Sequence, residues 1–140
     1  VDHSVALIDQ SGNIKALGAG TTDVLVLTKD GAVTATLEIT VEAVKAVTGI
    51  TATPATKAIK VGDTGVIGLD SASDIKLALT PAGATGYALS FAADNSFATV
   101  DAVTGHYEAM GAGTTVVTVT ATNLDGTTKT ATVTFTITAP

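Results

Sequence analysis

The sequence predicts an all-β protein built as a β-sandwich, and three observations support this. Threonine is the commonest of the 140 residues, and β-branched threonine and valine fit the pleated surface of a sheet. Several runs alternate apolar residues with threonine at a period of two, as half-buried strands do. Turn residues separate these runs, and nowhere do apolar residues keep the three-and-four spacing of an amphipathic helix.

The alternation is clearest in three segments, residues 36–41, 115–122 and 131–138. In each segment the apolar residues fall on one face, and threonines dominate the other. In chain order the apolar faces consist of Leu37, Ile39 and Val41; of Val117, Val119 and Ala121; and of Ala131, Val133, Phe135 and Ile137. Each segment is therefore expected to be a strand with one buried face.

Turn signals lie between the strands. Asp-Gly pairs within residues 29–31 and 124–126 stand between alternating runs, which is a strong hairpin signal. Residues 11–13 (SGN) and 104–106 (TGH) are shorter turns of the same kind. The expected connections are therefore tight hairpins.

An internal repeat organises the chain. Residues 6–20 (ALIDQSGNIKALGAG) and 98–113 (ATVDAVTGHYEAMGAG) correspond, and each continues into Thr-Thr, a strand, an Asp-Gly turn and an alternating strand. The matching residues are Asp9 with Asp101, Gly12 with Gly105, and Gly18-Ala19-Gly20 with Gly111-Ala112-Gly113. Only the second copy is preceded by a further stretch, residues 47–97. The sequence therefore predicts the C-terminal half of one sandwich domain in residues 1–44 and a complete domain in residues 45–140.

Further motifs in the complete copy match a known family. They are residues 47–54 (VTGITATP), 59–64 (IKVGDT), 80–86 (TPAGATG) and 97–101 (FATVD), and a Gly-x-x-x-Ala-x-x-x-Gly pattern at residues 105–113 that recurs at residues 12–20. With these motifs the chain resembles the bacterial immunoglobulin-like domains of group 2. The resemblance implies a Greek-key, immunoglobulin-like β-sandwich.

The sequence departs from the family pattern at two places. The family often has a tryptophan on the strand after the Thr-Pro-Ala turn, whereas residues 87–91 (YALSF) have none, so Leu89 or Phe91 is expected to fill that core position. The stretch Gly65–Ser73 (GVIGLDSAS) resembles an insertion before the strand at residues 75–79. A loop added there would offer a contact surface peculiar to this protein.

Half a sandwich cannot bury its own core. Residues 1–44 are expected to expose an apolar face and a strand edge. Either upstream sequence supplies the other strands, or a neighbouring chain does so by strand addition. The start at Val1, with neither an initiator methionine nor a secretory signal, is consistent with a start inside a longer polypeptide.

Composition excludes several classes of partner. The formal net charge is -6, and every basic residue is a lysine. Without arginine or a basic patch, binding to nucleic acid is not expected. No apolar run approaches the roughly 18 residues of a membrane helix, so membrane insertion is not expected. The chain has no cysteine, and therefore no disulfide, thiol nucleophile or zinc-thiolate site.

No catalytic residue is expected, and the chain is predicted not to be an enzyme. His3 lies near the start, and His106 lies in a turn where the first copy has Asn13, which favours a solvent-facing side chain over a general base. Ser90 and Ser96 have no acid–base partner in a recognisable pattern.

Acidic residues are expected to serve turns rather than a metal. Asp9 and Asp101 recur at equivalent positions, where an aspartate ends a strand and bonds the backbone of its own turn. Residues 70–74 (DSASD) and the pair Asp94-Asn95 offer oxygen ligands. They are interpreted as solvated loops, with calcium binding as the alternative. Neither follows the alternating acidic loop of an EF-hand, so no metal or other cofactor is expected.

Two further motifs have a structural interpretation. Tyr87, Phe91, Phe97 and Tyr107 could stack on a glycan, but with no tryptophan in the chain most of them are needed in the core. Gly18-Ala19-Gly20 and its copy lack the following helix and the lysine of a phosphate-binding loop. They are expected to form a tight crossing before a strand.

The resemblance implies a non-enzymatic structural or adhesion module. Family members occur in invasin- and intimin-type adhesins, surface-layer proteins and phage virion proteins, which implies an extracytoplasmic place on a bacterial surface or a virion. The implied partners are neighbouring domains or subunits of the same assembly, or a cell-surface receptor or glycan. Two alternatives remain: a self-assembling subunit whose half-domain is completed by a neighbour, and a carbohydrate-binding module of a secreted enzyme.

Overall fold

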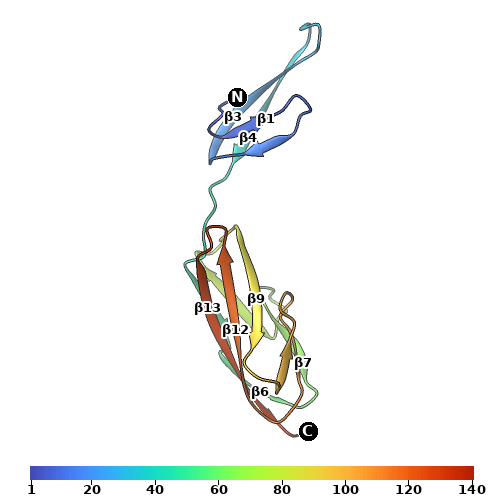
Figure 1. Ribbon diagram of the computed structural model, residues 1–140, viewed down its shortest axis with the longest axis vertical. Helices are drawn as coiled ribbons and strands as arrows, with labels where there is room; N and C mark the ends of the chain where they lie inside the picture. The colour runs from blue at the N-terminus through green and yellow to red at the C-terminus, as the bar shows by residue number, and fades with distance from the viewer. The chain divides into compact units, whose positions relative to one another are not determined.

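The computed structural model describes residues 1–140, and its regular elements are all strands (Figure 1). The chain forms two compact units, Val1–Val44 and Lys45–Pro140, called here the N-terminal unit and the C-terminal unit. The N-terminal unit contains β1 (Ala6–Ile8), β2 (Ile14–Ala16), β3 (Gly20–Leu27) and β4 (Thr34–Val41). The C-terminal unit contains β5 (Gly49–Thr53), β6 (Thr56–Lys60), β7 (Thr64–Gly68), β8 (Ile75–Thr80), β9 (Tyr87–Ala93), β10 (Ala98–Val100), β11 (His106–Ala109), β12 (Gly113–Asn123) and β13 (Thr128–Thr138). The chain has no helix capable of spanning a membrane.

The C-terminal unit is an immunoglobulin-like β-sandwich (Figure 1). One sheet has the strand order β10-β11-β7-β8-β5, and the other has the order β6-β13-β12-β9. In immunoglobulin terms, β5 corresponds to strand A, β7 and β8 together to strand B, β11 to strand E and β10 to strand D. In the other sheet, β9, β12 and β13 correspond to strands C, F and G. The predicted all-β sandwich is confirmed.

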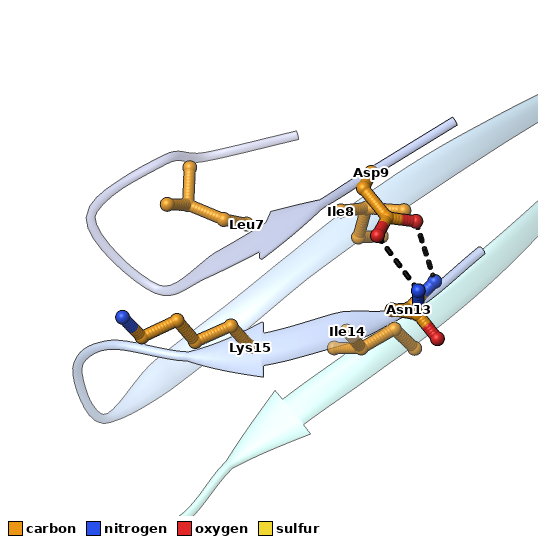
Figure 2. A pocket seen from close by; sticks show the side chains of 6 residues that line it. All are labelled: Leu7, Ile8, Asp9, Asn13, Ile14 and Lys15. Carbon is orange, nitrogen blue, oxygen red and sulfur yellow. Dashed lines mark hydrogen bonds between the residues drawn. The ribbon is translucent and has the colours of Figure 1, made fainter. Parts of the chain in front are cut away.

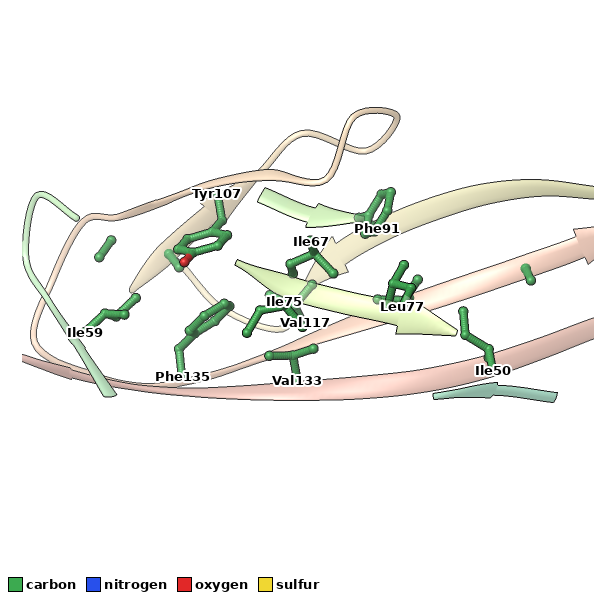
Figure 3. Close-up of a cluster of buried hydrophobic side chains, with 14 of the residues drawn as sticks. Ile50, Ile59, Ile67, Ile75, Leu77, Phe91, Tyr107, Val117, Val133 and Phe135 are labelled. Carbon is green, nitrogen blue, oxygen red and sulfur yellow. The ribbon is translucent and has the colours of Figure 1, made fainter. Parts of the chain in front are cut away.

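Alternate residues of the long β12–β13 hairpin point into the core, as their periodicity predicts. Val117 and Val119 of β12 and Val133 and Phe135 of β13 are fully buried. Figure 3 shows Val117, Val133 and Phe135 meeting side chains of the facing sheet. Among these is Tyr107 of β11, whose ring centroid lies 4.6 Å from that of Phe135. Side chains from both sheets therefore fill a single core.

The strand that lacks the family's tryptophan still contributes an aromatic ring to the core. Phe91 of β9 is buried, whereas Leu89 is half-buried and packs against the cluster from its margin. Of the two residues expected at this core position, Phe91 occupies it.

The expected insertion at Gly65–Ser73 is only partly a loop. Gly65–Gly68 belong to β7, which pairs with β11, and Ile67 in this strand is fully buried. A short parallel pairing places Ile67 opposite Ile75 of β8, so the chain leaves the sheet after β7 and re-enters it through residues 69–74. The expectation that the whole stretch is added loop was therefore wrong, because half of it supplies a core strand.

Two antiparallel hairpins make up the N-terminal unit. β1 pairs with β2 across the predicted turn at residues 11–13, and β3 pairs with β4 across the predicted Asp-Gly turn at residues 29–31. Val5, Ala6, Thr22 and Val24 are the buried side chains of this unit. The unit therefore has the beginning of a core, which its four strands do not enclose.

Glycine is the first residue of the long hairpin in both units because the backbone there runs close to a side chain. Gly20 has φ 151°, and a Cβ at this position would lie 2.9 Å from Cγ2 of Val5. Gly113 has φ 154°, and its Cβ would lie 2.7 Å from the ring of Phe97. The expected tight crossing before a strand therefore has the same physical cause in both copies.

Asn123, at the end of β12, fixes the start of the C-terminal unit. Its Oδ1 accepts a hydrogen bond from the backbone N–H of Val47 at 2.8 Å, and its Nδ2 donates to the Val47 carbonyl oxygen at 3.0 Å. Nδ2 also donates to Oγ1 of Thr127 at 2.9 Å. Both Asn123 and Val47 are buried, so this side chain takes the place of a strand partner for Val47.

Candidate functional site

The two recurring aspartates hold turns. Asn13 donates from its backbone N–H to Oδ1 of Asp9 at 2.9 Å and from its side chain to Oδ2 at 2.7 Å (Figure 2). Asp101 accepts from the N–H groups of Thr104 at 2.7 Å and Val103 at 3.0 Å. The Asn13 side chain lowers the pKa of Asp9, and the Thr104 backbone lowers the pKa of Asp101. Both carboxylates therefore serve local structure.

The histidines and serines considered as catalytic residues do not gather into one site. His3 lies in the N-terminal unit and is exposed, as are His106 at the start of β11 and Ser96. Ser90 is also exposed and lies on β9, opposite Thr120. A nucleophile with a base within hydrogen-bond reach is not formed from these four side chains.

The side chains considered as calcium ligands make local hydrogen bonds. Asp70 accepts from the N–H of Ala72 at 2.9 Å. Asp94 accepts at 2.9 Å from both the Val116 N–H and the Oγ1 of Thr115. No group of three or more histidine, cysteine, aspartate or glutamate side chains is placed to hold a metal ion.

The hydrogen bonds of Asp94 predict a pH-dependent contribution to stability. The Val116 N–H, followed by the Thr115 hydroxyl, lowers the pKa of Asp94 in the folded state. A lowered folded-state pKa gives stability that is present above the unfolded value of about 4 and is lost as the pH falls through the folded value. We expect Asp94→Asn, which keeps an acceptor oxygen but cannot ionise, to be less stable than the wild type at pH 7, and we expect this difference to shrink as the pH falls from about 4 toward 2.

Urea unfolding at pH 7 and near pH 2 measures this difference. Glu108→Gln, at an exposed position on β11, is the matched control for loss of a carboxylate, and its stability should stay parallel to the wild type. A difference between Asp94→Asn and the wild type that persisted unchanged in acid would contradict the assignment.

One polar cluster partly buried beside the core ties three strands together. Nζ of Lys57 lies 3.2 Å from Oδ1 of Asp74 and 3.2 Å from the hydroxyl oxygen of Tyr107. The Val66 N–H, which donates to Oδ2 of Asp74 at 3.0 Å, is the main cause of the lowered pKa of Asp74, and Lys57 adds to it. A Cβ at Gly65 would collide with both Asp74 and Tyr107. The cluster therefore satisfies the hydroxyl of a core tyrosine.

The aromatic residues do not form an exposed platform. Phe91 and Tyr107 are buried, and Tyr87 is half-buried against the core. Phe97 is 41% exposed and lies over Gly113. As the sequence indicated, most of the rings considered for glycan stacking are part of the core.

The most unusual surface lies on the N-terminal unit, where the strand pairing repeats that of β10–β13. The matching cross-strand pairs are Ala6–Ala16 with Ala98–Ala109, Ile8–Ile14 with Val100–Tyr107, Gly20–Val41 with Gly113–Ile137, Thr22–Ile39 with Thr115–Phe135, and Val24–Leu37 with Val117–Val133. Each residue of the N-terminal unit can therefore be compared with a defined counterpart.

Counterparts of core residues are exposed in the N-terminal unit. Leu37 is 52% exposed and Val133 0%; Val26 is 54% exposed and Val119 0%; Ile14 is 51% exposed and Tyr107 1%. Ile39 and Val41 are only half-buried, although their counterparts Phe135 and Ile137 lie in the core. We call the surface formed by Ile14, Val26, Leu37, Ile39 and Val41 the uncovered face. Exposed apolar surface of this kind makes the uncovered face a candidate interaction site.

Three strand edges border the uncovered face. β3 and β4 pair only with each other, and β2 pairs only with β1. In the C-terminal unit the corresponding strands have second partners: β12 pairs with β9, β13 with β6, and β11 with β7. Unpaired strand edges are templates for further strands.

Two hollows also lie on the N-terminal unit. One, of about 420 Å³, is lined by both strands of the β1–β2 hairpin, including Leu7, Ile14 and Lys15 (Figure 2). The other, of about 510 Å³, lies between residues 16–19 and 41–44. Both are open and largely apolar, and the first is bordered by the Asp9 turn. We therefore take residues 1–44 as the candidate functional site.

Two exposed leucines on the other face of β3 were not expected from the sequence. Leu25 and Leu27 lie on the face of β3 opposite to Val24 and Val26 and are 56% and 55% exposed. The run of apolar residues at 24–27 hides the period of two, so alternation could not assign these leucines to an outer face.

Comparisons with known proteins extend the fold assignment. No family model and no curated protein matches the chain. A structure of surface layer protein SbsC, domains 4-9, matches with a TM-score of 0.50 and 19% identity, over 100% of this chain and 21% of that one. The S-layer protein rSbsC(31-844) matches with a TM-score of 0.48 and 19% identity, over 99% of this chain and 19% of that one.

A third match is the C-terminal 282-residue fragment of intimin in complex with the intimin-binding domain of the translocated intimin receptor. Its TM-score is 0.35 at 19% identity, over 86% of this chain and 42% of the fragment. The chain thus spans about a fifth of the SbsC chains and less than half of the intimin fragment. At this identity the likeness to SbsC domains 4-9 concerns the fold.

Proposed function

We propose that the chain is a non-enzymatic structural and adhesion module of a larger extracytoplasmic protein on a bacterial surface or a phage virion. The observation that carries this proposal is the single pairing register shared by β1–β4 and β10–β13. When a polypeptide repeats one sandwich motif, it serves to space and present its domains rather than to enclose a reaction site. Membership of the bacterial immunoglobulin-like group 2 family, with residues 1–44 and 45–140 as tandem copies, is part of the proposal.

The chemistry of the outer sheet surface supports contact with proteins rather than with charged ligands. Threonines face each other across the β12–β13 hairpin, in the pairs Thr118–Thr132, Thr120–Thr130 and Thr122–Thr128. Threonine hydroxyls form hydrogen bonds with protein or sugar and carry no charge. The proposed partners are neighbouring domains or subunits of the same assembly, with a cell-surface receptor or glycan as a further ligand. SbsC, whose domains 4-9 share the fold, is a surface layer protein by name.

Surface labelling of the source organism tests this proposal. Antibodies raised against the purified 140-residue chain should label intact cells or intact virions, and brief protease treatment of the intact particles should remove the signal. Labelling of intact cells would indicate the bacterial surface, and labelling of intact virions would indicate the virion. Detection of the antigen only after lysis, or catalysis of a reaction by the purified chain, would contradict the proposal.

A further inference from the structure

We infer that the uncovered face of the N-terminal unit is the docking site of a β-segment that precedes it in the same polypeptide and supplies counterparts of β5–β9. This inference rests on the tandem arrangement in the proposed function. In the C-terminal unit those five strands directly precede β10, and they cover the three edges that stay unpaired in the N-terminal unit. The occupant is thus a segment similar in length and pattern to residues 45–96.

The shared register specifies how the segment docks. A strand runs parallel to β4, with a counterpart of Ile59 beside Val41, because β6 pairs in parallel with β13 and places Ile59 beside Ile137. A second strand runs antiparallel to β3, with a counterpart of Phe91 beside Val26. A third runs antiparallel to β2. Each of these strands presents apolar residues at alternate positions to the uncovered face.

The third strand differs from β7 in one predictable way. Gly65 of β7 lies opposite Tyr107, and the Asp74 carboxylate and the tyrosine ring and hydroxyl leave no room there for a Cβ. The N-terminal unit has Ile14 at the position of Tyr107, with a shorter side chain and no hydroxyl. The residue opposite Ile14 is therefore free to carry a side chain, which fills the volume that the tyrosine ring occupies in the other unit.

A second copy of this chain fits the site less well. The strands of its C-terminal unit already have their partners, and its N-terminal unit offers only counterparts of β10–β13, which are the strands already present. Two β4 strands related by a two-fold axis would pair antiparallel, whereas the corresponding edge of β13 receives a parallel strand. The geometry thus favours the missing strand set over self-association.

Hydrogen exchange and sedimentation of the 140-residue chain form the first test. We expect a monomer in which the amides of β3–β4 exchange at least about 100-fold faster than those of β12–β13, because an isolated two-stranded hairpin is marginally stable. A dimer with protected β3–β4 amides would make a second copy the occupant and overturn the inference. A monomer with equal protection in both hairpins would show that the face needs no occupant.

A chimeric chain forms the second test, with residues 45–96 of this protein as the probe segment. They are joined ahead of Val5, which corresponds to Phe97, so that the chain reads 45–96 and then 5–140. Protection of β3–β4 should rise at least about tenfold relative to a chimera carrying a shuffled segment. A second chimera with Ile14→Tyr restores the tyrosine opposite Gly65. It tests whether a cavity left between Gly65 and Ile14 prevents the segment from docking in the first chimera. If neither chimera protects β3–β4, the inference is wrong, while the surface labelling of the proposed function is unaffected.

Discussion

Gly105→Ala is expected to destabilise the C-terminal unit by about 2–5 kcal/mol. Gly105 has φ 70°, a left-handed conformation that costs an L-residue about 1–2 kcal/mol. Its Cβ would also meet the backbone carbonyl oxygen of Ile67 and, at 2.9 Å, the ring of Phe91. The Ile67 carbonyl belongs to a paired strand and Phe91 is buried, so neither can move aside easily. Overpacking of this kind adds about 1–3 kcal/mol.

Gly126→Ala is the matched control for this substitution. Gly126 has φ 83°, also left-handed, but a Cβ there meets nothing within 4 Å. It should therefore show the conformational cost alone, about 1–2 kcal/mol. Urea unfolding of both variants gives the difference. Equal losses would mean that the close approach of the β10–β11 turn to β7 does not exist in solution.

Asn123→Ala is the second substitution with a large expected effect, a loss of about 2–5 kcal/mol. It leaves the N–H and carbonyl groups of Val47 buried without partners, and an unsatisfied buried polar group costs about 1–3 kcal/mol. Asn123→Asp removes only one of the two hydrogen bonds to Val47. A carboxylate still accepts from the Val47 N–H, but it repels the Val47 carbonyl oxygen. We expect both variants to lower the urea midpoint with an unchanged slope.

Asn95→Ala controls for the loss of an amide side chain as such. Asn95 also makes two backbone hydrogen bonds, donating to the Thr114 carbonyl and accepting from the Phe97 N–H, but it is exposed. Water replaces those bonds, so the loss should be at most about 1 kcal/mol. If Asn123→Ala were no more costly than Asn95→Ala, Asn123 would not anchor the start of the unit.

Local pattern was sufficient to predict the long strands of the fold. Val117, Val133 and Phe135 alternate with threonine, and a period of two assigns a residue to a face without knowledge of its neighbours. β7 escaped this reasoning because it is short and contains two glycines, Gly65 and Gly68. Its strand character comes from pairing with β11, which is distant in the sequence, and from the burial of Ile67 in the shared core.

The candidate site could be predicted only in outline. The repeat indicated that residues 1–44 expose an apolar face, and Leu37 does lie there, exposed where Val133 is buried. The number of unpaired edges and the outward position of Leu25 depend on which strands pair and in which register. Those are non-local properties that no short stretch of sequence encodes. The role of Asn123 is equally hidden, because its partner Val47 lies 76 residues away.

The parallel pairing of β6 with β13 gives the C-terminal unit a directional resistance to mechanical force. β6 lies near the beginning of the unit and β13 at its end, and residues 56–60 pair in register with residues 134–138. When the two ends of the unit are pulled apart, parallel strands slide along each other, and their hydrogen bonds are strained together rather than one after another. Tension transmitted along a chain of such units would therefore meet this strand pair as a shear clamp, which breaks at a higher force than a hairpin unzipped from its open end.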